Sequence, residues 1–446
     1  MKTNYGRYRF RRFRAQWPCR LAAVALLSGL PAGLYPQDLL QGTSAEARGL
    51  PSGLKVNSVS AWVGRNYLLV PNTAGGPLES FMLGYGGGVD AGLYLPGKTT
   101  RASLNYNLGY NGNSTYSELN GFDHSLFFSL TRSLTRKLSF SLTGAGESTT
   151  VSGFLFQQVA GSTPDLSNAG ALAGSLAPAG TAGATQTILY PGRRQTATVA
   201  TTLSYSPSTR LSWHMSLHGQ RLLPSHSSGP NAQQTLGYPG ETDTGASLSL
   251  AYTLSRRTSF GAEAGYYRSM SQLGRTQSGS GGLSLTRVLS RRWFGSATVG
   301  YGLGDFFIAA SQTTVRRPDF QGSATLGTTF DAHTLSLSTA QRIGDSYGLG
   351  AQRTMEGNLS WIWHPRRQKW SFQATAAYER LTGGQVDKIQ SAVFRGALTR
   401  RLTARLSCTG EGGYTWGIVQ ASSSLGRQTQ NGARFSIVWR PAGTLW

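Results

Sequence analysis

Apolar and polar residues alternate with a period of two along most of this chain. The segment Ser125–Thr143 shows this most clearly, because Leu126, Phe128 and Leu130 alternate with hydroxyl residues and the pattern resumes after a short basic turn. Phe127 is the one exception. In a β-strand such alternation places apolar side chains on one face and hydroxyls on the other. The segment is therefore predicted to be a β-hairpin with one apolar and one polar face.

Similar turns recur about every 35–45 residues, which is typical of a repeat architecture whose unit here is a hairpin. The further turn sites are Pro96–Arg101, Ser206–Arg210, Leu254–Arg257, Leu289–Arg292, Phe330–Thr334, His364–Lys369 and Leu398–Arg401. Eight hairpins, a first strand near Lys55–Val63 and a last strand near Asn431–Arg440 predict about 18 strands. Gly64–Gly86 is expected to be a loop, and the connections between hairpins are expected to span about 10–45 residues. Short turns on one side and long loops on the other are typical of outer-membrane barrels.

Aromatic residues follow the same division. Tryptophans gather near the short turns or the C-terminal strand: Trp213, Trp293, Trp361, Trp363, Trp370 and Trp439. Tyrosines lie nearer the expected long loops: Tyr106, Tyr110, Tyr266, Tyr301 and Tyr378. Two aromatic belts around an apolar band are what two membrane interfaces select. The alternative is that these are ordinary core aromatics.

The composition favours the membrane interpretation. Glycine contributes 58 residues, and charged residues only 14%, against about 25% in typical globular domains. Ser, Thr and Gly take the place of charge as the polar partner, which suits strands between lipid and a water-filled interior. After the N-terminal region no segment approaches 18 consecutive apolar residues, so helical membrane spans are not expected.

Residues 1–47 are predicted to be a signal peptide and leader. Seven basic residues accompany the apolar run Leu21–Leu34, and Ala45-Glu46-Ala47 offers a small-residue cleavage site. The alternative is a short membrane anchor, although about 14 residues cannot span a bilayer. Cys19 lies in this region, so Cys408 is the single cysteine of residues 48–446, and no disulfide within that region is possible.

With these patterns, residues 48–446 resemble the Gram-negative outer-membrane β-barrel class and are porin-like in size. The resemblance implies an all-β fold: a single-domain transmembrane antiparallel up-and-down barrel of about 16–18 strands. It also implies a location in the bacterial outer membrane, contact with outer-membrane lipid, and small solutes or anions in the lumen. Nucleic acid is not an expected partner, because the arginines cluster at hairpin turns and not on one basic face.

Enzymatic chemistry finds little support in the sequence. The tightest His/Ser/Asn cluster, His226–Asn231, belongs to an expected loop and has no second element to orient a base. His214 and His218 share a polar face but lie too far apart for an easy shared metal. We expect no cofactor, metal or catalytic residue. The insertion Thr150–Gly192 is rich in Gly, Ala and Ser, and either folds into the lumen or lies outside it.

By strand parity the polar face includes ten candidate pore-lining residues, which are Asn105, Asn107, His214, His218, Glu263, Glu356, Gln373, Arg395, Arg405 and Arg434. The formal charge is +23, of which roughly +18 remains after residue 47. The sequence therefore predicts a porin-like passive or weakly anion-selective diffusion channel. The alternatives are a structural or export-accessory outer-membrane barrel and, third, a barrel enzyme such as a lipase or protease.

Overall fold

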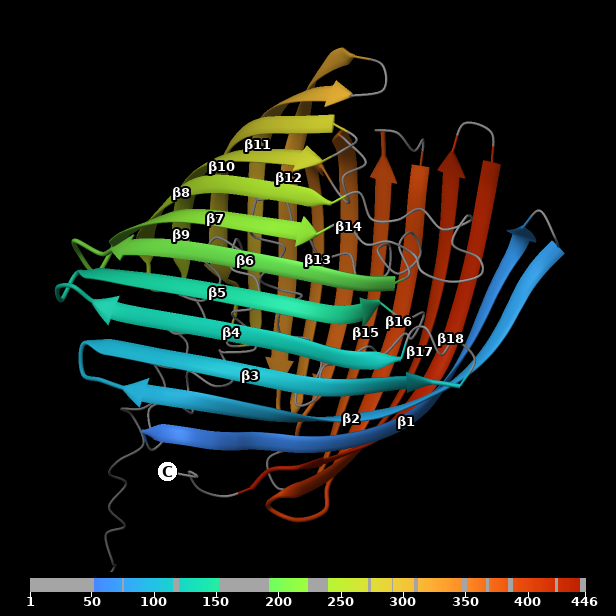
Figure 1. Ribbon diagram of the computed structural model, residues 1–446. Helices are drawn as coiled ribbons and strands as arrows, with labels where there is room; N and C mark the ends of the chain where they lie inside the picture. The colour runs from blue at the N-terminus through green and yellow to red at the C-terminus, as the bar shows by residue number, and fades with distance from the viewer. Residues whose placement is uncertain are drawn as a thin grey trace, which may run out of the picture.

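The structure is a computed structural model that describes residues 52–73, 76–114, 120–151, 192–223, 240–271, 274–290, 292–308, 312–345, 351–365, 369–383, 388–421 and 424–441. These residues form one antiparallel sheet of 18 strands (Figure 1). The strands are β1 (Gly53–Thr73), β2 (Gly76–Pro96), β3 (Thr100–Asn113), β4 (Gly121–Ser133), β5 (Leu138–Val151), β6 (Gly192–Tyr205), β7 (Leu211–Leu223), β8 (Glu241–Ser255), β9 (Thr258–Ser271), β10 (Gly274–Val288), β11 (Trp293–Ile308), β12 (Thr313–Phe330), β13 (His333–Asp345), β14 (Ala351–Trp363), β15 (Trp370–Thr382), β16 (Lys388–Arg401), β17 (Leu406–Ala421) and β18 (Ser424–Trp439).

The sheet closes on itself. Each strand pairs with its sequence neighbours, and β1 also pairs with β18 from Val59 opposite Trp439 to Leu69 opposite Thr429. Figure 1 shows these two strands side by side at the point of closure. The predicted up-and-down antiparallel barrel and its count of about 18 strands are therefore confirmed.

Most of the predicted short turns form as the sequence indicates. At Leu134–Lys137 the Thr135 hydroxyl accepts hydrogen bonds from the backbone N–H groups of Lys137 and Leu138, at 3.1 and 3.0 Å. Ser208, Ser290 and Thr403 accept from the second and third following residues in the same way. A hydroxyl residue at this position satisfies the amides that a tight turn leaves unpaired, which explains why Ser/Thr-Arg sequences recur there.

The turn between β16 and β17 differs from the prediction. Leu398–Arg401 was predicted to be the turn, but these residues end β16, and the turn is Leu402–Arg405. Both segments begin Leu-Thr and contain Arg, so turn chemistry alone does not distinguish them. The alternation of inward and outward residues continues along β16 as far as Arg401, so the turn forms at Leu402–Arg405.

The predicted loop Gly64–Gly86 is also wrong. Strand β1 continues to Thr73 and β2 begins at Gly76, with direct pairing throughout most of the segment. Along this part of β2 the outward residues Phe81, Leu83 and Tyr85 are exposed at 58%, 44% and 48%, so the alternation that indicates a strand continues through the segment. The intervals between β9 and β10 and between β17 and β18 are equally short, at residues 272–273 and 422–423. The expected connections of 10–45 residues therefore overestimate most intervals.

We call the barrel edge with the short turns and the described chain ends the turn edge, and the opposite edge the loop edge. The expected insertion Thr150–Gly192 falls between β5 and β6, where residues 152–191 lie outside the described part of the chain. Residues 1–51 and the His226–Asn231 cluster lie outside it as well.

The distribution of apolar side chains is the reverse of that in a water-soluble protein. Large hydrophobic residues such as Leu250 and Leu283 are exposed at 42% and 51%, whereas Thr, Ser, Asn and Gln dominate the buried positions. Residues that are direct partners across strands share a face, so this alternation extends around the barrel. The outer face is therefore apolar and the inner face polar, as a transmembrane barrel requires.

The aromatic residues fall on that outer face. Trp213, Trp293, Trp361, Trp370 and Trp439 are exposed near the turn edge, and Tyr106, Tyr266, Tyr301 and Tyr378 are exposed toward the loop edge. An apolar band between two aromatic rows is typical of barrels that span a bilayer.

Within the described residues, the structure contains no helix with the length and hydropathy of a membrane span.

The facing of Leu250 and Ser249 provides a direct test. The substitution Leu250→Arg would place a charged side chain on the outer apolar band, in contact with lipid. We expect it to destabilise the barrel by about 2–4 kcal/mol. Arg at Ser249 would point inward, directly opposite Glu263, and should be tolerated. Unfolding by guanidinium in lipid vesicles measures both variants. Equal destabilisation would contradict the assigned faces.

A second test addresses orientation. We predict that the turn edge lies on the periplasmic side, because short turns belong there in bacterial barrels. A cysteine at Ser255, beside the β8–β9 turn, should then be protected from a membrane-impermeant thiol reagent on intact cells. A cysteine at Thr313, at the start of β12 on the loop edge, should react. The unaltered chain, with Cys408 on the outer apolar face, is the control, and the reverse labelling would invert the orientation.

Candidate functional site

The candidate functional site is the inward-facing wall of the barrel. The structure places nine of the ten predicted pore-lining residues at inward-facing strand positions: Asn105 and Asn107 on β3, His214 and His218 on β7, Glu263 on β9, Glu356 on β14, Gln373 on β15, Arg395 on β16 and Arg434 on β18. Arg405 is the exception, because it lies exposed in the Leu402–Arg405 turn. Whether the nine contact a permeating solute stays a prediction.

The wall brings one ionic cluster together across three strands. Arg434 Nη2 on β18 donates a hydrogen bond to Glu411 Oε2 on β17 at 2.7 Å, and both side chains are almost fully buried. The Arg434 guanidinium carbon lies 5.7 Å from the ring centroid of Trp62 on β1, within the range of a cation–π contact. Arg395 on β16 sits diagonally from Glu411, whose direct partner is Ala397. The parity argument had identified both arginines but neither Glu411 nor Trp62.

A second network surrounds a bulge near the start of β1. Asn57 interrupts the β1–β2 register and donates from Nδ2 to Asp90 Oδ1 at 3.0 Å. The Tyr94 hydroxyl lies 2.8 Å from Asn105 Oδ1 and 3.1 Å from Asn57 Oδ1. The predicted residue Asn105 therefore belongs to a hydrogen-bonded group that fixes its orientation.

Carboxylates gather on two other parts of the wall, and among those named in this paragraph the sequence analysis identified only Glu356. On β8 and β9, Glu241 accepts from Ser269 Oγ at 2.6 Å and Asp243 accepts from Tyr267 Oη at 3.0 Å. On β14 and β15, Glu356 lies directly opposite Glu379. These partners could not be found by parity alone, because they depend on the register between strands.

Among the strand residues whose side chains the structure describes, carboxylates predominate on the inner face. The inward acidic residues are Asp90, Asp123, Glu147, Glu241, Asp243, Glu263, Glu356, Glu379 and Glu411, and the inward basic residues are Lys55, Arg101, Arg317, Arg395, Arg401 and Arg434. Asp319 is left out of this comparison because its carboxylate forms an ion pair with the outward Arg353. Of the basic residues, Lys55, Arg101 and Arg401 lie close to the turn edge. Asp123, Glu241 and Asp243 likewise lie close to the loop edge. In the middle of the wall the acidic residues Asp90, Glu263, Glu356, Glu379 and Glu411 outnumber the basic residues Arg395 and Arg434.

The outer face shows the opposite balance. Its basic residues with described side chains are Arg65, Arg132, Arg221, Arg268, Arg275, Arg287, Arg316, Arg353, Arg380, Lys388, Arg400 and Arg427. Asp305 is the single outward carboxylate among the strand side chains that the structure describes. Among the described side chains, the excess of positive charge thus lies on the outside of the wall and at the turns.

Several inward side chains lie along the wall because a glycine faces them. The imidazole of His218 covers Gly245, its direct partner on β8, and a Cβ at position 245 would collide with the ring. Gln321 covers Gly302 and Phe306 covers Gly304 in the same way. These glycines permit close approach of neighbouring side chains, which keeps bulky groups close to the wall.

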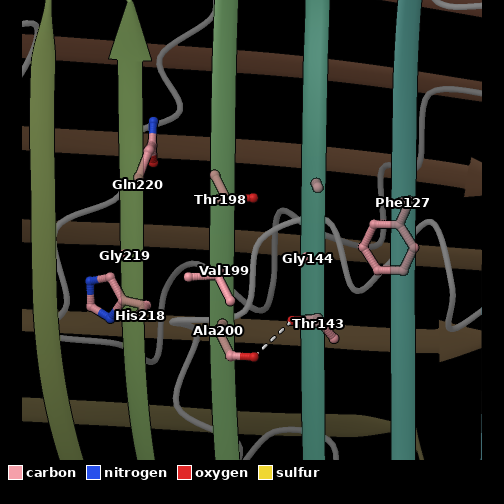
Figure 2. Close-up of a pocket in the computed structure, with 10 residues that line it drawn as sticks. Phe127, Thr143, Gly144, Thr198, Val199, Ala200, His218, Gly219 and Gln220 are labelled. Carbon is pink, nitrogen blue, oxygen red and sulfur yellow. Dashed lines mark hydrogen bonds between the residues drawn. The ribbon is translucent and has the colours of Figure 1, made fainter.

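Figure 2 shows a hollow in the wall across β4 to β7. It is lined mostly by small side chains, with Phe127 on one side and His218 and Gln220 on the other. Thr143 Oγ1 donates across it to the Ala200 carbonyl at 3.5 Å. Phe127, the exception to the alternation in the sequence, points inward here, opposite Asn105 and Ala145.

Within the described part of the chain, His, Cys, Asp and Glu residues form no group of three or more that could hold a metal ion. Cys408 lies on the outer face and is a free thiol.

Comparisons with known proteins add structural similarity at low identity. No protein-family model matches the sequence, and no curated protein matches it. Among solved structures, Pseudomonas aeruginosa OccK2 (OpdF) in complex with glucuronate is 12% identical with a TM-score of 0.43, covering 88% of this chain and 100% of that chain. P. aeruginosa OpdK is 13% identical with a TM-score of 0.40, over 86% and 99%. The FrpB iron transporter of Neisseria meningitidis (F5-1 variant) is 9% identical with a TM-score of 0.44, over 92% and 84%. At these scores the similarities carry no argument about function, and the barrel assignment rests on this chain's own strand pairing.

The ionic cluster yields a stability prediction. Glu411→Gln removes the carboxylate that lies between two arginines, and we expect it to destabilise the barrel by about 3 kcal/mol because it leaves buried positive charge uncompensated. Glu411→Gln/Arg434→Gln should lose less, because the second substitution removes one of the stranded charges. Guanidinium unfolding in lipid vesicles, arranged as a double-mutant cycle, measures the coupling. A double variant as unstable as the sum of the single variants would contradict the interaction.

Proposed function

We propose that this protein is a passive diffusion channel for small hydrophilic solutes. The observation that carries the proposal is a closed 18-strand wall with polar inward and apolar outward positions. Barrels of 16–18 strands are wide enough to leave an aqueous channel. A closed wall with a polar lining allows water and solutes to pass without contact with lipid.

The proposed location is the bacterial outer membrane. Support comes from the exposed apolar band, its aromatic rows and the arrangement of both described chain ends on the turn edge. We retain the expectation that residues 1–47 are a signal peptide and leader and that residues 48–446 are the barrel domain. Outer-membrane lipid is then the partner of the outer face.

The geometry favours a weak cation preference over the anion preference expected from the sequence. The expected anion preference was based on the net positive charge of the chain. Among the described side chains, however, most of the excess positive charge lies on outward-facing strand positions. Glu263, Glu356 and Glu379 point into the lumen, where a low-dielectric wall strengthens their effect on mobile ions. Fixed negative charge concentrates cations in the channel, so the proposed substrates are neutral and positively charged small solutes.

Conductance separates this proposal from its rivals. A structural or export-accessory barrel and a barrel enzyme would not require steady ionic current through the purified chain. Purified protein in a planar lipid bilayer should produce stepwise conductance increases, and protein that inserts as a folded barrel without conductance would contradict the channel.

Selectivity is tested by reversal potentials across a KCl gradient. At about 0.1 M salt, where the Debye length is about 10 Å, we expect a K⁺ to Cl⁻ permeability ratio of about 2–5. The ratio should approach one near 1 M. Glu263→Gln/Glu356→Gln should lower it, whereas Asp305→Asn, on the outer face, should leave it unchanged. A preference for Cl⁻ at low salt would overturn the proposed sign.

A further inference from the structure

The hollow in the inner wall across β4 to β7 combines an aromatic ring with uncharged polar groups, which passive diffusion does not by itself require (Figure 2). Phe127, Ala145, Thr198 and Gln220 form one row of direct partners on these four strands. Phe127 is the central residue of β4 (Gly121–Ser133), so the row crosses the wall midway between the two edges. Every solute that traverses the lumen passes this height.

From this row we infer that the hollow is a binding site for a neutral hexopyranose, that is, an uncharged six-membered sugar ring. The inference rests on the proposed channel, because it names a class of solute that the lumen would admit. Binding itself requires only the folded wall, however, and can be measured without ionic current.

Phe127 forms the aromatic side of the hollow. It is the one large apolar side chain among the inward residues of β4, where its inward neighbours are Ser125 and Ser129. Figure 2 shows its ring extending from β4 toward β5, and the side chain is only half-buried. A hexopyranose carries C–H groups on the faces of its ring, and these can pack on an aromatic face. A sugar thus matches an aromatic ring on an otherwise polar surface.

The floor of the hollow is low because its residues are small. Ala145 and Ala200 contribute only methyl groups. The Thr143 hydroxyl is held against the wall, where it donates to the Ala200 carbonyl at 3.5 Å. Three inter-strand spacings separate β4 from β7, which is about 14 Å between backbones. With Phe127 and Gln220 at the two ends, the remaining space suits a single ring better than a long chain.

The polar groups of the row suit the hydroxyls of a sugar. Gln220 carries a carboxamide with both donor and acceptor atoms, and Thr198 carries a hydroxyl that can also do both. Both side chains are half-buried at inward positions. Binding sites for small molecules typically combine an apolar or aromatic surface with a few polar groups that fix orientation, and this row provides both.

The position of His218 keeps the hollow open. Its imidazole lies over Gly245 on β8, away from β6 (Figure 2). A Cβ at position 245 would collide with the ring, so Gly245→Ala must displace the imidazole. Ala200, the direct partner of His218 on its other side, belongs to the floor of the hollow. A displaced ring would therefore occupy space that the sugar needs.

The charges around the hollow favour a neutral sugar over a sugar acid. Among the described residues that line it, none carries a carboxylate, ammonium or guanidinium group. Glu147 lies on β5 one row nearer the loop edge, two residues from Ala145. Its negative charge opposes the approach of an anionic solute. A glucoside should therefore bind more tightly than glucuronate.

The test measures binding of methyl β-glucoside to the purified full chain in detergent by saturation-transfer NMR. We expect Phe127→Leu to weaken binding about fivefold, because leucine retains apolar volume but lacks the aromatic face. Phe128→Leu is the matched control, since Phe128 is the adjacent outward residue on the same strand, and it should stay within about twofold of the unaltered protein. Glucuronate should bind the unaltered protein more weakly than the glucoside.

A second pair of variants tests the role of His218. Gly245→Ala should weaken binding of the glucoside because the imidazole moves over the floor of the hollow. His218→Ala/Gly245→Ala should restore it, because the ring that blocks the site is gone. This rescue separates obstruction of the hollow from a general effect of substitution in β8.

The following outcomes would overturn the inference. Unchanged binding in Phe127→Leu, or equal loss in Phe128→Leu, would exclude the aromatic face, and glucuronate that binds as tightly as the glucoside would exclude the neutral class. Should Phe127→Leu fail to fold, unchanged binding in Gly245→Ala or absence of rescue in the double variant would still reject the site. Bilayer conductance of the same samples separates the two proposals. A conducting chain that binds no glucoside contradicts this inference alone, and a chain that binds glucoside without conductance contradicts the channel alone.

Discussion

The pairing of β1 with β18 is the constraint on which the remaining structure depends. A strand in hydrocarbon has no water to satisfy its N–H and C=O groups, so an open sheet edge inside a bilayer would cost several kcal/mol for each unpaired group. Closure gives every strand two neighbours and removes both edges. It also fixes which face points inward, because residues that are direct partners must share a face around the whole circumference.

Once the inward and outward faces are fixed, the type of side chain at each position matches the medium that it contacts, lipid outside and water inside. Outward positions carry Leu, Val and aromatic residues that remain exposed in the isolated chain, and inward positions carry Ser, Thr and carboxylates held by hydroxyl donors such as Tyr267 and Ser269. Glycine has a structural role within this arrangement. At Gly245 and Gly302 it lets His218 and Gln321 lie along the wall, so bulky polar groups occupy the surface of the lumen and project less into its centre.

The sequence predicts the parts of this fold that local chemistry determines. Alternation identifies Leu250 as outward and Ser249 as inward, and hydroxyl residues such as Thr135 identify turns because they bond nearby amides. Two features of the fold could not be predicted from local sequence chemistry. The segment Gly64–Gly86 contains Pro71 and Pro77, which indicate a loop by local chemistry, yet most of it pairs as the end of β1 and the start of β2. The contact between Glu411 and Arg434 joins residues 23 positions apart, and strand parity gives their common face but not the register that brings them together.

The charge of the chain illustrates why composition is a poor guide to the lumen. Net charge is a sum over both faces, whereas ions in a channel respond mainly to the inner one. The two faces select opposite signs for a physical reason. Long arginine side chains can remain outward near either edge, because their stems contact hydrocarbon while the guanidinium reaches headgroups. Carboxylates have short stems and gain little beside phosphates, so water and hydroxyl donors on the inner face suit them better. A strongly basic sequence can therefore enclose an acidic channel, and the sign of its selectivity follows from the direction in which each strand points.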